Sequence, residues 1–494
     1  MRRTFARSLL ASAAVLVIAA CGGGGGSSST GNTAPPAPPS NQNLSPPIAK
    51  SSLSGLAATG APVAGAAVAV QCASGATLNG STDANGKWSL ELSNQAFPCL
   101  VTVSGGTLPA GQSLYSVAID KDSALNVTPL TTLITAGAAG ALPASLASDA
   151  AALTAASKAL EASLARVNAS LAAAGYDTLE GNPFVTAFKP QAGDAHDDLI
   201  SSLMRSLKDE AQTLTELATA FAESRDEVPV PHTHVFAASE LTRDAMPQLN
   251  QASLSVEAGV LKMTLPEASN NVGSFVGGGN GNKAVLQLPG LAGTKLSDLK
   301  DVTMQVSGPN SVVYGGTPKN VYTYMNFTVD TDCSQPALNP ATHTLQEMRD
   351  RYRIFIYDPY VNFIQRNNAI SATQISTINF TLATPGWRVS AGPVLGTDIA
   401  TNASYQGHET LAGFNFDKYP NACIVDGVTG DGGMYRDATC ASASSLNADA
   451  PGSCGKSYRG AIVVLGDSST VWPAEWKVKK VRVNTKSARN FVFE

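Results

Sequence analysis

Hydrophobic and polar residues alternate along much of the second half of the chain, as they do in strands that expose one face. Residues 260–265 (VLKMTL) show the pattern well. A region of roughly 245 residues with many such runs has the make-up of a β-sandwich or jelly roll, so we predict this fold for residues 248–494. The strand runs predicted there are 254–256, 260–265, 302–306, 324–329, 352–357, 461–465 and 476–483.

The middle of the chain has a helical rather than an alternating pattern. Thr128 followed by Pro129 is a typical helix start, with a capping hydroxyl and a proline in the first turn. Apolar residues then recur at helical spacing in residues 151–174 and 194–221. We therefore predict a helical region over residues 128–226, in the form of an inserted α-helical hairpin. The segment 227–247 follows as a proline-containing linker.

Residues 51–127 return to strand patterns. Residues 65–70 and 88–92 read as strands, and 81–87 (STDANGK) reads as a tight turn in which Asn-Gly accepts positive φ. The combination of GAPVAGAAVAV and TDANGKWSL resembles the carboxypeptidase regulatory-like, or transthyretin-like, domains of bacterial surface proteins. The resemblance implies a small β-sandwich that acts as a spacer without catalytic residues.

Two further resemblances concern the rest of the chain. The segments YMNFTVDTDC, RIFIYDP, GWRV and YPNACI are similar to galactose-binding-like jelly rolls, and LYSVA with NVTPLTTLI resembles betaproteobacterial-type surface lipoproteins. The expected fold class is therefore mainly β with a helical insert: an N-terminal transthyretin-like β-sandwich, an α-helical hairpin and a C-terminal β-sandwich or jelly roll.

The first residues predict where the protein is located. Residues 1–20 have a basic start and a short apolar run, as secretion signals do, and Ile18-Ala19-Ala20-Cys21 resembles a bacterial lipobox. The resemblance implies that Cys21 is acylated and that membrane lipid is a partner through this residue. Gly22 in place of Asp implies the outer membrane, with the body facing the periplasm or the cell surface. Residues 21–50 are rich in Gly, Ser and Pro and predict a flexible tether.

Composition excludes one class of partner. Charged residues make up only 14% of the chain and the formal net charge is −5, and the signal segment holds three of the arginines. No basic stretch is available to neutralise phosphates, so we expect no nucleic-acid partner.

Cysteines after the anchor are even in number, as expected for disulfides in an exported protein. Domain boundaries favour a pair within the N-terminal sandwich and two pairs in the last domain; free buried thiols are the alternative. The expected pairs are Cys72–Cys99, Cys333–Cys423 and Cys440–Cys454.

Candidate catalytic and metal sites are weak. Gly466-Asp467-Ser468 resembles the serine block of GDSL-type esterases, but no histidine follows it, so a turn is the preferred interpretation. The pair His232 and His234 lacks a third ligand in sequence, and we predict no metal site there. Residues 330–332 (DTD) and 426–433 offer oxygen ligands to a structural calcium ion, and turn formation explains them equally well. No other cofactor is expected.

Aromatic residues give the functional hypothesis. Trp387, Trp472, Trp476 and Tyr405 lie in the last domain and are candidates for stacking on a sugar, with core packing as the alternative. We favour a non-enzymatic, lipid-anchored envelope protein with a binding or structural role, whose partner is a carbohydrate or an envelope protein. The alternative is an envelope hydrolase acting on a glycan or an ester.

Overall fold

The fold is taken from a computed structural model of the chain. It describes residues 51–121, 124–242, 251–267, 282–336, 351–357, 370–384, 386–390, 419–425, 460–466 and 470–494, together with positions 246, 338, 347 and 359. Strands predominate over helices in this part of the chain, as the alternating pattern predicts.

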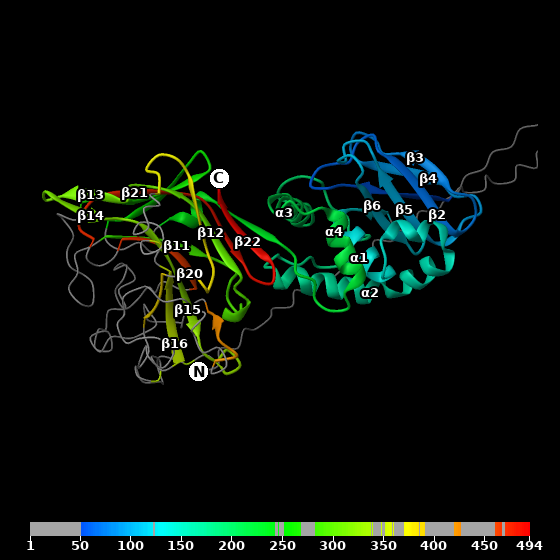
Figure 1. The fold of residues 1–494 in the computed structure, drawn as a ribbon. Helices are drawn as coiled ribbons and strands as arrows, with labels where there is room; N and C mark the ends of the chain where they lie inside the picture. The colour runs from blue at the N-terminus through cyan, green and yellow to red at the C-terminus, as the bar shows by residue number, and fades with distance from the viewer. Residues whose placement is uncertain are drawn as a thin grey trace, which may run out of the picture. The chain divides into compact units, whose positions relative to one another are not determined.

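Two small sheets form the N-terminal sandwich (Figure 1). One has the order β4-β1-β7 and the other the order β3-β2-β5-β6. Cys72 and Cys99 lie directly opposite each other on β2 and β5 and form a disulfide, which confirms the predicted pair. The strands are β1 (Ser52–Ala57), β2 (Ala67–Ser74), β3 (Leu78–Ser81), β4 (Lys87–Glu91), β5 (Ala96–Ser104), β6 (Ser113–Ala118) and β7 (Leu125–Val127).

The predicted turn before β4 is organised by Asp83. Its carboxylate accepts hydrogen bonds from the backbone N–H groups of Asn85 and Lys87, at 2.8 Å each. Gly86 has a φ of 76°, and a Cβ there would lie 2.4 Å from the carbonyl oxygen of Ala57. Only glycine fits both the conformation and the close approach, so the sequence interpretation of this turn is confirmed.

Four α-helices follow, where the sequence predicted a hairpin. Thr128 caps the first helix and Pro129 stands in its first turn, as expected. The predicted helix over 194–221 is two helices, because Ala211 adopts a φ of 51° and Thr213 starts a new helix in a capping box with Glu216. The helices are α1 (Pro129–Ala139), α2 (Ala150–Ala173), α3 (Ala195–Asp209) and α4 (Leu214–Glu223).

The helices and the N-terminal sandwich share one hydrophobic core. This core runs from Leu53 of β1 through Leu133 of α1 and Leu203 of α3 to Phe221 of α4, all fully buried. The helical region is therefore packed onto the sandwich rather than standing apart from it. None of the helices in the described ranges combines the length and apolar character needed to cross a membrane.

The segment predicted as a linker contains a strand. Residues His232–Phe236 form β8, which pairs in parallel with the last strand, β22 (Ala488–Phe493). The chain thus enters the C-terminal sandwich directly after Pro231 and adds to one edge of a sheet. The expectation of a passive connection over 227–247 is corrected to this extent, because Thr233 and Phe236 are buried in that pairing.

Two larger sheets form the C-terminal region (Figure 1). The seven-stranded sheet has the order β17-β12-β21-β10-β9, with β22 pairing β21 and β8 pairing β22. The six-stranded sheet has the order β11-β20-β15-β16-β18, with β19 on β15. The strands are β9 (Ser253–Glu257), β10 (Val260–Leu265), β11 (Lys283–Leu288), β12 (Asp301–Ser307), β15 (Thr323–Asp330), β16 (Tyr352–Tyr357), β17 (Ser376–Phe380), β18 (Trp387–Ser390), β19 (Cys423–Ile424), β20 (Ala461–Gly466) and β21 (Ala474–Asn484). A separate hairpin consists of β13 (Ser311–Tyr314) and β14 (Thr317–Asn320).

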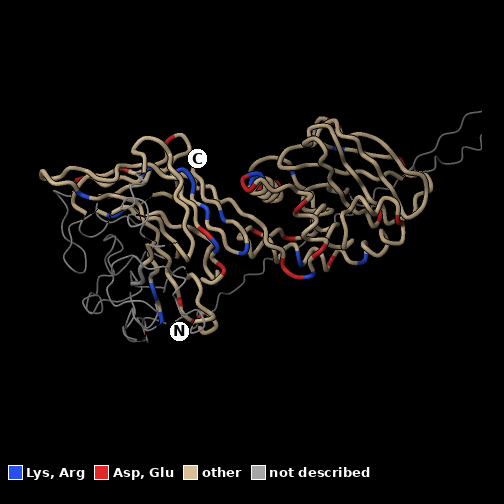
Figure 2. Tube along the Cα trace, in the orientation of Figure 1, with Lys and Arg blue, Asp and Glu red and all other residues tan. Residues whose placement is uncertain are grey.

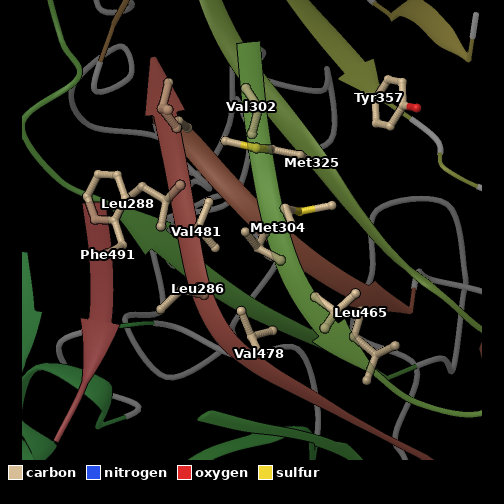
Figure 3. Close-up of a cluster of buried hydrophobic side chains, with 14 of the residues drawn as sticks. Leu286, Leu288, Val302, Met304, Met325, Tyr357, Leu465, Val478, Val481 and Phe491 are labelled. Carbon is tan, nitrogen blue, oxygen red and sulfur yellow. The ribbon is translucent and has the colours of Figure 1, made fainter. Parts of the chain in front are cut away.

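The two C-terminal sheets bury a common core between them. Figure 3 shows Met304 and Val481 of the seven-stranded sheet and Leu286, Met325 and Leu465 of the six-stranded sheet pointing into the same space. These side chains are fully buried. Since one face of the seven-stranded sheet is sealed in this way, its polar residues lie on the opposite face.

Candidate functional site

The outer face of the seven-stranded sheet is polar, and β21 lies near its centre. Along β21, Trp476, Val478 and Val481 are buried, whereas Lys477 and Lys479 are exposed. The apolar residues of β21 therefore face the core, and its alternating polar residues face the solvent. Lys and Arg residues follow one another where β21 and β22 run (Figure 2).

A β-bulge places two consecutive lysines on this face. Gln305 of β12 pairs with Lys480 and Val306 pairs with Val478, so Lys479 has no partner on β12. Lys479 is exposed and Lys480 is half-exposed, before Val481 returns to the core. Bulges re-aim side chains in this way. The result is a row of three lysines, Lys477, Lys479 and Lys480, called the lysine row below.

Hydrogen-bonding side chains flank the lysine row on the neighbouring strands. Ser307 pairs with Lys477 and Gln305 with Lys480 on β12, and Lys262 lies opposite Lys477 on β10. Thr377, which is exposed, continues the face on β17 opposite Gln305. The face therefore offers hydroxyl and amide groups on the β12 side of the amines.

Other cations of this face are neutralised within the protein. Lys262 is 3.2 Å from Glu257 and 3.3 Å from Glu475, and the hydrogen bond with Glu257 is the main reason that its pKa is raised. Arg482 is 2.9 Å from Glu210 and 3.0 Å from Asp301.

The lysine row, by contrast, makes no direct ion pair, although the charge of Lys480 acts on Glu210 and helps to lower the pKa of that carboxyl. Lys477, Lys479 and Lys480 form no ion pair with any residue within the described ranges. Lys477 and Lys479 therefore remain available to an external anion, with Lys480 beside them.

A hollow of about 580 Å³ lies at the Lys477 end of the row. It falls within the range of about 300–1,000 Å³ that is usual for ligand pockets. Its wall combines polar groups with proline and other apolar side chains. The lining residues are Thr264, Leu265, Pro266, Ser307, Gly308, Pro309, Val312, Ala372, Pro473, Ala474, Glu475 and Lys477.

One buried polar group in this wall lacks a partner. Ser307 is 1% exposed, and its Oγ makes no hydrogen bond. The Oδ1 of Asn310, in the loop that leads to β13, is also unsatisfied, although its amide nitrogen donates to the carbonyl of Ile370 at 2.8 Å. A buried hydroxyl without a partner destabilises the folded protein by about 1–3 kcal/mol, so its presence in a cavity wall suggests a ligand that supplies one.

The predicted sugar-stacking residues have different positions. Trp387 and Trp476 are 0% exposed and belong to the core, so the stacking hypothesis is wrong for these two: neither has a free ring face. Trp472 is half-buried and packs against the core. The amine of Lys319 lies 5.8 Å from the centroid of its ring. It immediately precedes Pro473 in the wall of the hollow. Tyr405 lies outside the described residues.

The predicted disulfides are confirmed for the cysteines that the structure describes. Cys333 and Cys423 form a disulfide that joins the end of β15 to β19. The expected Cys440–Cys454 pair, the predicted acylation site Cys21, Ser468 and the 426–433 loop lie outside the described residues.

The two candidate metal sites are occupied by protein groups. Arg351 donates to both carboxylate oxygens of Asp330, at 2.8 and 2.9 Å, and to the carbonyl of Asp332. A guanidinium thus takes the position that calcium would need at residues 330–332. His234 lies 3.0 Å from Glu240, and His232 packs against Tyr176 with ring centroids 4.5 Å apart. In the described part of the chain, no group of three or more His, Cys, Asp or Glu residues is placed to hold a metal ion.

A second hollow, of about 630 Å³, lies on the N-terminal sandwich beside Trp88 and Phe188. Asn126, in its wall, donates to the carbonyls of Pro183 and Thr186, so the covering segment is tied to the sheet. Lys87 is the only cation among the lining residues. We favour the C-terminal hollow as the functional site because it continues into the lysine row.

Comparison with known proteins gives no further guide. No family model, curated protein or solved structure matches the chain.

Proposed function

We propose that the protein is a lipid-anchored component of the bacterial cell envelope that binds a glycan through its C-terminal, jelly-roll-like sandwich. Cys21 would hold the protein on the outer membrane, residues 22–50 would serve as the tether, and the N-terminal sandwich with its helices would be the spacer. The ligand would lie in the hollow and along the outer face of the seven-stranded sheet.

The single observation that supports this function most strongly is the unsatisfied Ser307 hydroxyl in the wall of the hollow. A sugar carries many hydroxyl groups, each of which donates and accepts hydrogen bonds. It can therefore satisfy Ser307 and, at the same time, the hydroxyl of Thr264 and the amide of Gln305 nearby. The proline and valine side chains of the wall suit the apolar face of a sugar ring.

A blocking substitution tests the proposal. Thr264 is half-buried on β10 and lines the hollow, so Thr264→Trp should fill it while keeping a residue that favours strands. Purified full-length protein would be screened on an array of neutral and acidic glycans. We expect a hit for the wild type that is weakened at least tenfold by Thr264→Trp.

The control places the same indole on the other sandwich. Asn79 is exposed on β3, and Asn79→Trp should leave the array signal unchanged. Equal binding by the wild type and Thr264→Trp would contradict the location of the site. The absence of any glycan hit for the wild type would contradict the function.

A further inference from the structure

We propose that the ligand of this face is an anionic polysaccharide, whose carboxylate or sulfate groups bind the lysine row. This inference rests on the proposed glycan-binding function and adds the chemical class of the ligand. It starts from the contrast between the three lysines of the row and every other cation of the same face.

Spacing is the first reason. Residues two apart on a strand are separated by about 7 Å, so Lys477 and Lys479 stand at that interval on the outer face. The bulge adds Lys480 beside them. Several amines at regular intervals along one strand suit a chain with repeated acidic groups better than a ligand with a single charge.

The energetic balance is the second reason. Lys262 lies directly opposite Lys477, and like charges in that position destabilise a sheet. Glu257 and Glu475 offset the charge of Lys262, and Glu210 interacts with Lys480, but no described residue forms an ion pair with Lys477 or Lys479. Lys477 and Lys479 form no ion pair within the described residues, so their arrangement beside Lys480 points to an external anion.

The surroundings favour a polysaccharide over the other polyanions of a cell. Ser307, Gln305 and Thr377 present groups that match sugar hydroxyls. The strands beside the row carry polar side chains on this face, whereas membrane-binding surfaces also present apolar or aromatic side chains to lipid.

Three matched variants of the full-length protein test the inference. The first is Lys477→Gln/Lys479→Gln/Lys480→Gln, which removes the charge of the row from exposed positions. The second is Lys87→Gln/Lys158→Gln/Lys189→Gln, which changes the net charge equally at exposed sites elsewhere. The third is Thr264→Trp. The probes are polygalacturonate, neutral dextran, vesicles that contain phosphatidylglycerol, and duplex DNA.

We expect polygalacturonate to bind the wild type and the second variant alike, and to bind the lysine-row variant at least tenfold more weakly. Binding should also weaken between 0.05 and 0.5 M salt, because exposed charges are screened over a shorter distance as salt rises. Thermal unfolding of the lysine-row variant should change little, because the repulsion between Lys477 and Lys262 is removed together with the attraction between Lys480 and Glu210.

Several results would overturn the inference. Equal polygalacturonate binding by the wild type and the lysine-row variant would do so, and so would stronger binding to the vesicles or to DNA. Binding of dextran or another neutral glycan, lost in Thr264→Trp but kept in the lysine-row variant, would leave the proposed function standing and refute the anionic ligand. Failure to bind any glycan would refute both.

Discussion

Arg482 of β21 donates hydrogen bonds to both carboxylate oxygens of Glu210, which directly follows helix α3. Its Nε lies 3.0 and 3.1 Å from the two oxygens and a terminal nitrogen lies 2.9 Å from one of them. Asn490 of β22 adds a hydrogen bond of 2.8 Å to the same carboxylate. The helical region and the C-terminal sheet are therefore joined by a half-buried ion pair, two residues along β21 from Lys480 of the lysine row.

Loss of the Glu210 charge should destabilise the protein. Burial alone would raise the pKa of Glu210, but the hydrogen bonds from Arg482 and Asn490 lower it below its ordinary value. Glu210→Gln should reduce the free energy of unfolding in urea by about 1.5–3 kcal/mol, the usual range for hydrogen bonds to charged groups.

The same substitution at an exposed glutamate is the control. Glu223→Gln, at the end of α4, should change the free energy of unfolding by less than about 0.5 kcal/mol. Because the pKa of Glu210 is lowered in the folded protein, its contribution is present above the unfolded pKa and is lost as the pH falls through the folded one. The difference between the wild type and Glu210→Gln should therefore shrink in acid; a constant difference would contradict this role.

His232 should make the folded protein sensitive to acid. Burial, the nearby charge of Arg489 and His234 lower its pKa from 6.5 to about 4. A histidine with a lowered pKa stabilises the fold above the unfolded pKa, and this stability is lost as the pH falls from about 6.5 toward 4. The loss is on the order of 3 kcal/mol at 1.36 kcal/mol for each tenfold change in the proton equilibrium.

The measurement compares the wild type with His232→Gln by urea unfolding at pH 7 and pH 4.5. Burial also lowers the pKa of His196 to about 4, and burial with Asp198 and Asp194 raises that of Asp197 to about 6. As the pH falls, His196 lowers the stability of the folded protein and Asp197 raises it. Both groups are present in the wild type and in His232→Gln, so their effects are the same in the two proteins. We expect the wild type to lose more stability than the variant; equal losses would show that His232 does not titrate in this range.

The Cys333–Cys423 disulfide should contribute strongly to stability. It joins residues 90 apart in sequence, against 27 for Cys72–Cys99. The chain-entropy model assigns roughly 4–5 kcal/mol to the longer loop and roughly 3–4 kcal/mol to the shorter one. Cys333→Ser/Cys423→Ser should therefore lower the thermal midpoint more than Cys72→Ser/Cys99→Ser. The reverse order in calorimetry would contradict the loop-length reasoning.

The proposed lipid anchor has a direct test of its own. Cys21→Ser should release the protein from membranes or block its processing, because two or more acyl chains are needed for stable anchoring. Cell fractions would be washed with carbonate and probed for the protein. A variant that stays in the washed membranes would contradict the anchor.

Much of the architecture follows from the alternation and capping signals of the sequence. The strands 260–265 and 352–357 and the start of α1 at Pro129 lie where they are predicted. Local signals do not report the partner of a strand, and for this reason the sequence predicts a linker where β8 lies. The residues of β8 are held by pairing with β22, which is more than 250 residues away.

Less of the candidate site could be predicted from the sequence. Tryptophan is a common sugar-binding residue, and the sequence therefore favours Trp476 as a candidate. However, Trp476 is two residues from Val478 on the same strand, so both side chains point into the core. The doublet Lys479-Lys480 breaks the alternation of β21, and that break is the signal of the bulge and of the lysine row. Ser307 carries no sequence signal, because its lack of a partner depends on contacts made only in the folded chain.

Hydrogen–deuterium exchange of the full-length protein, with and without polygalacturonate oligomers, tests the binding face most directly. We predict that the oligomers slow exchange in peptides that cover β12 (Asp301–Ser307) and β21 (Ala474–Asn484), and leave β2 (Ala67–Ser74) of the N-terminal sandwich unchanged. Protection confined to the N-terminal sandwich, or no protection at oligomer concentrations that saturate the array signal, would contradict the assignment of the outer face of the seven-stranded sheet as the glycan-binding surface.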